Sequence, residues 1–327
     1  MRAKTRLFFT TLLASLMALP AAAEEDARPN VVATTGMIAD SVRQVAGEHV
    51  EVRGLMGPGV DPHLYRQTRS DISAMTRADA VFWNGLYLEA QLDDFLARLA
   101  SRKPVVAVAE AVPAEQRRAD DESPDQPDPH VWMDPNRWQH AVDAIEVALS
   151  ELAPEHADDF AANADAFKQE LSALDDYARE ILASVPEDSR VLVTAHDAFG
   201  YFGDAYDFEV LGIQGFSTES EAGLSRIEEL VAMLVERRIG AIFVESSVSE
   251  RNVRALVEGA AAQDHQVRIG GELYSDAMGP PGSYEGSYLG MLDHNMTVIA
   301  RALGGEAPAA GRLGRLAQAN AENEDDK

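Results

Sequence analysis

The tripeptide Asp-Pro-His occurs twice in this chain, at positions 61–63 and 128–130. Two further side chains that can bind metal, His196 and Asp276, follow the apolar segments VLVTA and QVRIG in the second half. Neutral imidazole and carboxylate together suit borderline and moderately hard divalent ions such as Zn²⁺ and Mn²⁺. A proline before His63 and before His130 restricts the backbone and helps to fix where each ring points. These four residues are therefore candidate metal ligands.

Several neighbouring residues are candidates for supporting this site. The carboxylates of Asp61 and Asp128 can either accept a hydrogen bond from an imidazole N–H or cap a helix, and the sequence leaves both roles open. Glu245 ends the apolar segment AIFVE, and we expect it either beside a ligand or as an additional ligand. Packing residues expected to line or cap the site are Asn84, Tyr65 and Trp132. The histidines without a comparable placement, which we interpret as ordinary, are His49, His140, His156, His265 and His294.

Short β-branched segments alternate with helical patterns, which predicts an α/β fold with mainly parallel sheets covered on both faces. Four strands are expected in each half: Val31–Thr35, Val50–Leu55, Ala80–Trp83 and Val105–Val108, then Val191–Ala195, Glu209–Ile213, Ala241–Glu245 and Gln266–Ile269. The expected helices are Met37–Ala46, Tyr65–Met75, Leu88–Leu99, Arg226–Arg237, Glu250–Ala262 and Ser287–Ala302. Each candidate ligand then lies beyond the carboxyl end of a strand, where open α/β sheets bind ligands. If the two carboxyl edges face each other, all four candidates converge in one cleft.

The segment 154–184 lacks glycine and interior proline, and its apolar residues recur every three or four positions. This spacing predicts one long amphipathic helix that joins two lobes stiffly. We divide the chain into a signal peptide (1–23), an N-terminal metal-binding lobe (30–153), a linking helix (154–185), a C-terminal metal-binding lobe (186–305) and a disordered acidic tail (306–327). The polar segment 114–128 is expected to form an acidic surface loop.

The first residues have the pattern of a secretory signal. Arg2, Lys4 and Arg6 precede the apolar stretch Leu7–Leu19 and three alanines that end at Ala23, where we expect cleavage. A membrane anchor is the alternative, although the apolar stretch is short for a bilayer. The chain has no cysteine, which excludes disulfides, thiolate metal sites and lipid attachment to cysteine. We therefore expect a free periplasmic protein.

The charge of the chain bears on its partners. The formal net charge is −27. Without residues 1–23, which hold three cations and no acid, it is about −30. Such a surface repels nucleic acid and anionic lipid, and it is also typical of high solubility or a salty medium. We expect a monomer that does not bind nucleic acid.

Six stretches of this sequence resemble the metal-binding components of ABC importers for zinc and manganese: VVATTGMIADSVRQVAG, LMGPGVDPHLYRQT, VFWNGLYLE, DPHVWMDP, TAHDAFGYF and ELYSDAMG. The similarity extends from Asn30 to Gly305. The resemblance implies two α/β lobes, a rigid linking helix and one buried Zn²⁺ or Mn²⁺ per chain. It implies that the ligands are His63, His130, His196 and Asp276, and that the partner is a membrane permease that receives the ion.

The resemblance does not decide which ion is carried. Members regarded as manganese proteins often have Glu at the position of His196, whereas many zinc or mixed members have His. Zinc-dedicated members often carry a His-rich acidic loop before the second ligand, but segment 114–128 contains no histidine. Three imidazoles and one carboxylate favour zinc by ligand softness. Zinc, manganese and iron stay open as the physiological ion.

Two other functions are compatible with a metal site, a metal-dependent hydrolase and an adhesin-type surface protein. The motifs His-Glu-x-x-His, Gly-x-Ser-x-Gly and Gly-x-Gly-x-x-Gly do not occur in the chain. A site with four protein ligands also leaves no evident position for a catalytic water. We therefore expect a binding protein rather than an enzyme.

Overall fold

The strands of the N-terminal half form one parallel sheet in the order β2-β1-β3-β4. The computed structural model describes residues 28–119 and 126–317. The strands of this sheet are β1 Asn30–Ala33, β2 Glu51–Gly54, β3 Ala80–Trp83 and β4 Val105–Ala107. The helices between them are α1 Gly36–Ala46, α2 Arg69–Arg77 and α3 Asp93–Ala100. The predicted four-stranded parallel sheet is confirmed for this half.

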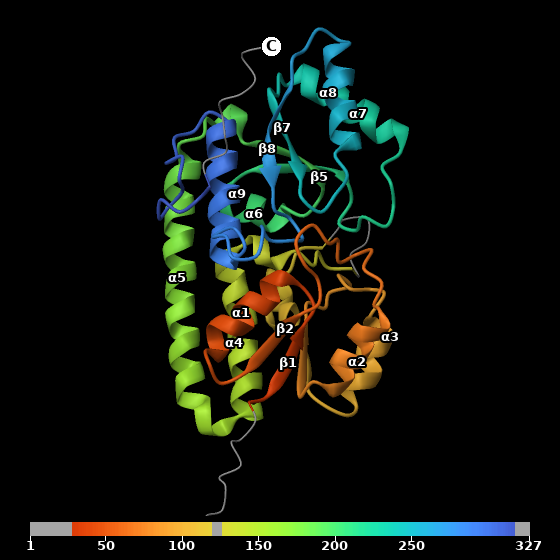
Figure 1. Cartoon of the computed structure of the whole chain (residues 1–327). Coiled ribbons are helices and arrows are strands. Elements are labelled where there is room, and N and C mark those ends of the chain that lie inside the picture. Colours follow the sequence, from red (N-terminus) through yellow and green to blue (C-terminus); the bar gives the residue numbers. More distant parts are fainter. Residues whose placement is uncertain (1–27, 120–125, 318–327) are drawn as a thin grey trace, which may run out of the picture.

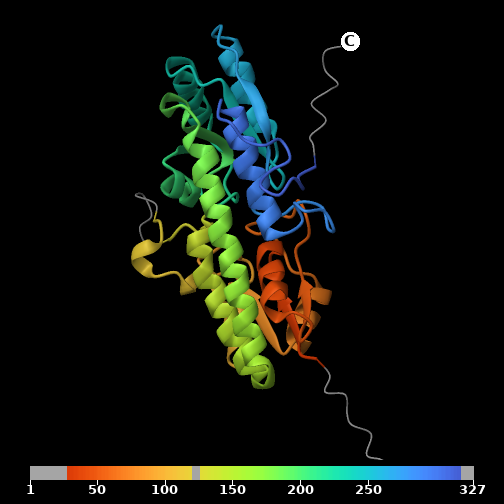
Figure 2. The same ribbon diagram turned by 90° about the vertical axis from the view of Figure 1, so that its left-hand side faces the viewer.

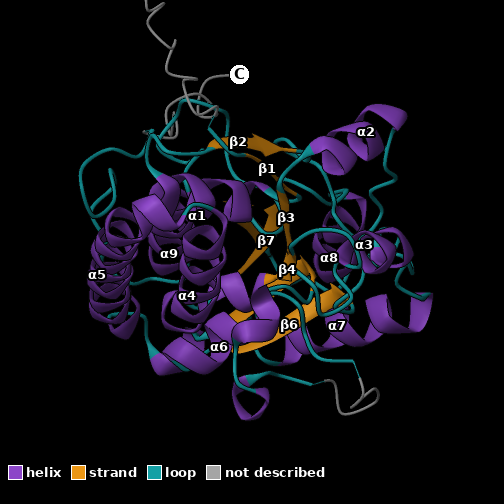
Figure 3. Cartoon of the chain, turned by 90° about the horizontal axis from the view of Figure 1, so that it is seen from below, coloured by secondary structure: helices purple, strands orange, loops and turns teal. Residues whose placement is uncertain are grey.

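Both faces of this sheet are covered, which explains why its central strands are apolar without alternation. Ala33 and Phe82 belong to the core shared with α1 and the long helices of the molecule. Val32 and Val81, on the opposite face, pack in a separate cluster with residues of α2 and α3. Figure 3 shows α1 and α4 on one side of the strands and α2 and α3 on the other.

The C-terminal half contains four more strands, in the places where we predicted them. They are β5 Val191–His196, β6 Glu209–Gln214, β7 Ala241–Glu245 and β8 Arg268–Leu273. Their hydrogen bonds form two parallel pairs, β5-β6 and β7-β8, rather than one continuous ladder. β5 lies next to β7 without forming a ladder with it. At the end of β5 the N–H of His196 donates to the side chain of Glu245 rather than to the backbone of β7. The helices of this half are α6 Gly200–Tyr206, α7 Leu224–Glu236, α8 Arg251–Ala261 and α9 Tyr288–Ala302.

Two long helices connect the halves. α4 Pro135–Leu152 is followed by a 3-10 turn, Pro154–His156, and by α5 Ala157–Ala183. The 27 residues of α5 extend over about 40 Å, alongside both halves of the molecule (Figures 1 and 2). α5 contacts α1 and α4 of the first half and α9 of the second. The predicted long helix is confirmed, whereas the lobe boundaries that we drew around it stay a prediction.

Two predicted helices begin later than expected, for different reasons. α2 begins at Arg69 rather than Tyr65, because Thr68 and Asp71 form a capping box there. α3 begins at Asp93 rather than Leu88, because residues 88–92 continue a series of turns that starts with a left-handed segment. In this segment Gly85, Leu86 and Tyr87 have φ angles of 78°, 52° and 65°, which a right-handed helix excludes.

The prediction of a disordered tail is wrong for residues 306–317. Leu316 is buried, the N–H of Arg312 donates to Asp293, and the N–H of Ala317 donates to Glu285. An apolar side chain and two backbone hydrogen bonds thus attach this segment to the body of the protein. The predicted signal peptide, the centre of the acidic loop at 120–125 and the tail from residue 318 lie outside the described residues. Among the described helices, none has the length and apolar character needed to cross a bilayer.

Candidate metal centre

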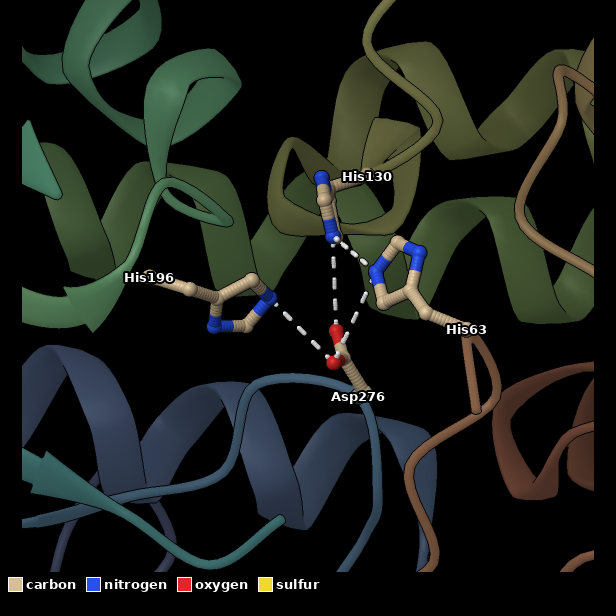
Figure 4. Close-up of side chains that lie close together, drawn as sticks. All are labelled: His63, His130, His196 and Asp276. Carbon is tan, nitrogen blue, oxygen red and sulfur yellow. Dashed lines mark hydrogen bonds and ion pairs between the residues drawn. The ribbon is translucent and has the colours of Figure 1, made fainter. Parts of the chain in front are cut away.

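The fold brings His63, His130, His196 and Asp276 into one buried cluster (Figure 4). His63 follows β2, His130 directly precedes the 3-10 turn Val131–Met133, His196 ends β5 and Asp276 follows β8. The exposed fractions of the four residues are 3%, 0%, 0% and 2% in that order. Two of these residues come from each half of the chain, so the cluster lies where the two carboxyl edges face each other.

The three imidazoles present the same nitrogen to the centre of the cluster. The Nε2 atoms of His63 and His130 are 3.3 Å apart. Asp276 lies opposite them, with Oδ1 3.5 Å from Nε2 of His130 and Oδ2 3.2 Å from Nε2 of His196. Nε2 of His63 is 3.9 Å from Oδ2 of Asp276. The four donor groups thus surround a common point.

Carboxylates hold two of the rings from behind. Nδ1 of His130 donates to Oδ1 of Asp128 over 2.7 Å, and Nδ1 of His196 donates to Oε2 of Glu245 over 2.6 Å. Such a bond fixes the tautomer in which Nε2 is free to bind a metal ion. Nε2 of His196 and both oxygens of Asp276 are buried without a hydrogen-bond partner in the described part of the chain. Buried polar atoms of this kind need a partner, and a divalent cation fits this donor set.

The two Asp-Pro-His motifs make the same turn but different side-chain bonds. Asp61 accepts a bond from the N–H of His63 over 2.8 Å, and Asp128 accepts one from the N–H of His130 over 2.9 Å. Only Asp128 also reaches the ring of its histidine. The second oxygen of Asp61 instead accepts a hydrogen bond from the hydroxyl of Thr218 over 2.6 Å. This bond joins the first half of the chain to the loop after β6.

Comparison with known proteins places this arrangement in a family. Residues 31–302 match the family described as zinc-uptake complex component A, periplasmic. The chain belongs to this family. Among its relatives is the manganese-binding lipoprotein MntA of Bacillus subtilis, which is 48% identical over 297 residues, or 91% of this chain and 97% of that protein. The zinc-binding protein TroA of Treponema pallidum is 47% identical over 281 residues, or 86% of this chain and 91% of TroA.

Solved structures of the family have the same fold. The structure of the periplasmic zinc-binding protein TroA from Treponema pallidum matches with a TM-score of 0.82 and 47% identity, covering 84% of this chain and 99% of that chain. The Fe(III)-bound YtgA of Chlamydia trachomatis matches with a TM-score of 0.77 and 27% identity, covering 85% and 99%. The predicted α/β fold and the resemblance to metal-binding components of ABC importers are confirmed.

Burial and neighbouring charges shift the proton affinities within the cluster. Burial lowers the pKa of His63 to about 3. Burial would also lower the pKa of His196, but Glu245 and Asp276 outweigh it and hold that pKa well above its usual value. Burial alone would raise the pKa of Asp276. The nearby imidazoles, above all that of His196, outweigh burial and hold this pKa below its usual range. The carboxylates of Glu245 and Asp276 thus favour the protonated form of His196.

One side of the cluster faces a surface pocket of about 260 Å³. His63 is the member of the cluster that lines this pocket. Leu86, Tyr87 and Pro129 contribute from the first half, and Phe216 and Ser217 contribute from the loop after β6. Among the four donors, His63 is therefore the one that this pocket reaches.

The residues expected to line the cleft have separate roles. The Asn84 side chain donates to the carbonyl of Pro129, directly before His130. The Trp132 ring lies 5.1 Å from that of His130, and its N–H donates to the carbonyl of Ser275, directly before Asp276. Tyr65 instead donates to Asp71 at the start of α2, outside the cluster. Glu245 lies behind His196 and is not among the four converging residues.

The sequence did not reveal Arg118, a cation that lies close behind the cluster. Its Nε atom is 3.6 Å from Oδ2 of Asp128, and its Nη1 pairs with Asp204 of α6. A side chain at Gly200 would press against this guanidinium and Oδ2 of Asp128, so the guanidinium would have to shift. Because Arg118 is in the segment that we interpreted as an acidic loop, no local signal indicated an inward-pointing cation.

Proposed function

We propose that this chain is the periplasmic binding component of an ABC importer and carries one divalent transition-metal ion, Zn²⁺ or Mn²⁺. In this proposal His63, His130, His196 and Asp276 bind the ion, which is the cargo and is delivered to a membrane permease. The observation that carries the proposal is the convergence of three Nε2 atoms and one carboxylate, from both halves of the chain, at a buried point.

The surroundings of the cluster favour transport over catalysis. A catalytic zinc site keeps one position open for water or substrate, whereas a site with four protein ligands and buried walls does not. The two orienting carboxylates, Asp128 and Glu245, support tight binding, because such partners fix the direction of each ring. The pocket beside His63 supplies a path for loading and release.

The N-terminal sequence and the family support a location outside the cytoplasmic membrane. We propose export with cleavage near Ala23 and release of a soluble monomer into the periplasm. The relative from Bacillus subtilis is named a lipoprotein, but the 327 residues of this sequence contain no cysteine to carry a lipid. The domain division into lobes at 30–153 and 186–305 around a linking segment at 154–185 belongs to the same proposal.

The experiment is elemental analysis of protein isolated from its own periplasm without chelators. Wild-type protein should contain close to one equivalent of Zn or Mn, and the His196→Ala variant should contain much less. The matched control is His265→Ala, since His265 hydrogen-bonds to the carbonyl of Ile239 outside the cluster. The proposal would be rejected if wild-type protein contained no metal, or if His196→Ala and His265→Ala contained equal amounts of metal.

A further inference from the structure

A second group of metal-binding side chains lies at the far end of the N-terminal half. His49, His156 and Asp159 each offer one donor atom, and these atoms lie within 4.8 Å of one another. Nε2 of His49 is 3.1 Å from Oδ2 of Asp159. His49 precedes β2 whereas His63 follows it. The second group is therefore at the end of the sheet opposite the cleft, near the lower end of α5 in Figure 1.

The fold holds the two imidazoles in place before any ion binds. Their ring centroids are 3.8 Å apart and the rings are stacked at 19°. Phe160, which is fully buried, packs edge-on against both rings at 5.9 and 6.2 Å. The side chain of Asn163 donates to the carbonyl of Val45 and attaches this part of α5 to the end of α1. A metal ion lies close to the plane of each imidazole that binds it, so one of these stacked rings must turn before both nitrogens can reach the same ion.

The third donor is free to adjust. The side chain of Asp159 is 62% exposed, so its carboxylate can rotate towards an ion that both rings approach. The donor atoms, which lie within 4.8 Å of one another, must move closer together, because the ligands of a zinc ion with bonds of about 2.0–2.2 Å lie close to ~3.4 Å apart. Two nitrogens and one oxygen, completed by water, form a set that prefers Zn²⁺ to Mn²⁺.

We propose that His49, His156 and Asp159 form a second, weaker site for a nitrogen-preferring divalent ion, with Zn²⁺ as its best ligand. Exposure to solvent and the positive end of α5, where His156 is the N-cap residue, both reduce the affinity for a cation. The site is independent of the proposed cargo site, since it shares no residue with the cleft cluster. A bound ion would link the start of β2 to the start of α5.

The test is calorimetric titration of the full exported chain with Zn²⁺ and, separately, with Mn²⁺. Wild-type protein should bind a second Zn²⁺ at least roughly 100-fold more weakly than the first, and should show no second Mn²⁺ phase. The Asp159→Asn and His156→Ala variants should keep the first phase and weaken the second by about tenfold or more. Asp159 is exposed, so Asp159→Asn should leave folding intact.

Two controls separate this site from the cleft. His140→Ala, which removes a partly buried histidine of α4, should keep both phases. His63→Ala should lose the tight phase and keep the weak one. A single Zn²⁺ phase in wild type up to millimolar metal, or a second phase that is unchanged in Asp159→Asn and His156→Ala, would overturn the inference.

Discussion

Nδ1 of His196 donates to Oε2 of Glu245 over 2.6 Å, and the backbone N–H of the same histidine donates to Oε1 over 2.9 Å. One carboxylate from the end of β7 thus holds both the ring and the backbone of a residue at the end of β5. The pair fixes the direction of Nε2 towards Asp276. It also places a negative charge where it stabilises a proton on His196.

The first prediction concerns protons released on metal binding. The pKa of His196 is raised by Glu245 and Asp276, so an ion competes with a proton for this imidazole at a higher pH than it would at a free histidine. Metal affinity should therefore fall as the pH is lowered, whereas His63, with a pKa of about 3, should contribute no proton above pH ~4.

Calorimetry at pH 7 in buffers of different ionisation enthalpy measures the released protons. Wild type should release about one proton per ion from His196. The Glu245→Gln variant should release fewer, because its His196 has a lower pKa, and its loss of affinity should occur at lower pH. An identical proton count and pH profile in both proteins would contradict this assignment.

Much of the fold could be predicted because the local signals agree with the tertiary structure. The apolar strands β1, β3, β5 and β7 are largely buried on both faces. The carboxyl ends of β2, β5 and β8 lead to the candidate ligands as expected. α4 was not predicted, although Asp134 and Pro135 mark its start and Trp138, Val142 and Ile145 recur at helical spacing. These helix signals were present in the sequence. They come directly after the second Asp-Pro-His motif, which we interpreted only as part of a metal site, so the helix was missed.

Other features could not be predicted, because they depend on contacts between distant segments. Asp61 and Asp128 have the same local sequence, yet only Asp128 bonds to an imidazole ring. Thr218, 157 positions from Asp61 in sequence, determines the difference. The guanidinium of Arg118 reaches Asp204 of α6, which is 86 positions away in sequence. Sequence spacing can place residues at the edge of a sheet, but it cannot assign partners across a cleft.

The second prediction concerns the bond between Asp61 and Thr218, which joins the first half of the chain to the loop after β6. Thr218→Val keeps the shape of the side chain but leaves a carboxylate oxygen of Asp61 without its donor. A hydrogen bond to a charged group contributes about 1.5–3 kcal/mol, so metal release should accelerate by roughly tenfold or more. Stopped-flow transfer of the ion to a chelator measures this rate. Thr76→Val is the control, since the Thr76 hydroxyl donates to the carbonyl of Ile72 within α2, and equal rates in the two variants would exclude a role for the bond.

The third prediction concerns Arg118 and stability. Arg118→Ala removes the cation beside Asp128, a carboxylate that is fully buried. Because Arg118 is itself 31% exposed, the expected loss is about 1–2 kcal/mol in the free energy of unfolding, less than for a fully buried pair. Arg117→Ala is the matched control, since Arg117 bonds to the carbonyls of Val112 and Glu110 in its own segment. In urea unfolding at pH 7, Arg118→Ala should have a lower free energy of unfolding than Arg117→Ala. The reverse order would show that the ion pair is not stabilising.

The fourth prediction concerns the choice of ion. His196→Glu replaces a nitrogen donor by a harder oxygen donor and should shift the binding ratio from zinc towards manganese by about tenfold or more. The new carboxylate would face Glu245, so the double variant His196→Glu/Glu245→Gln removes the resulting repulsion. Competition titrations of wild type and both variants with the two ions measure the ratio. If neither variant changes it, position 196 does not set selectivity.

The most direct measurement is a calorimetric titration of wild type and of the single variants His63→Ala, His130→Ala, His196→Ala and Asp276→Ala. Each variant removes one of the four buried donors, so each should weaken the tight binding of Zn²⁺ by at least about 100-fold. His265→Ala should bind as wild type does. Wild-type affinity in the four cleft variants, with circular dichroism showing intact folds, would contradict the assignment of this cluster as the cargo site.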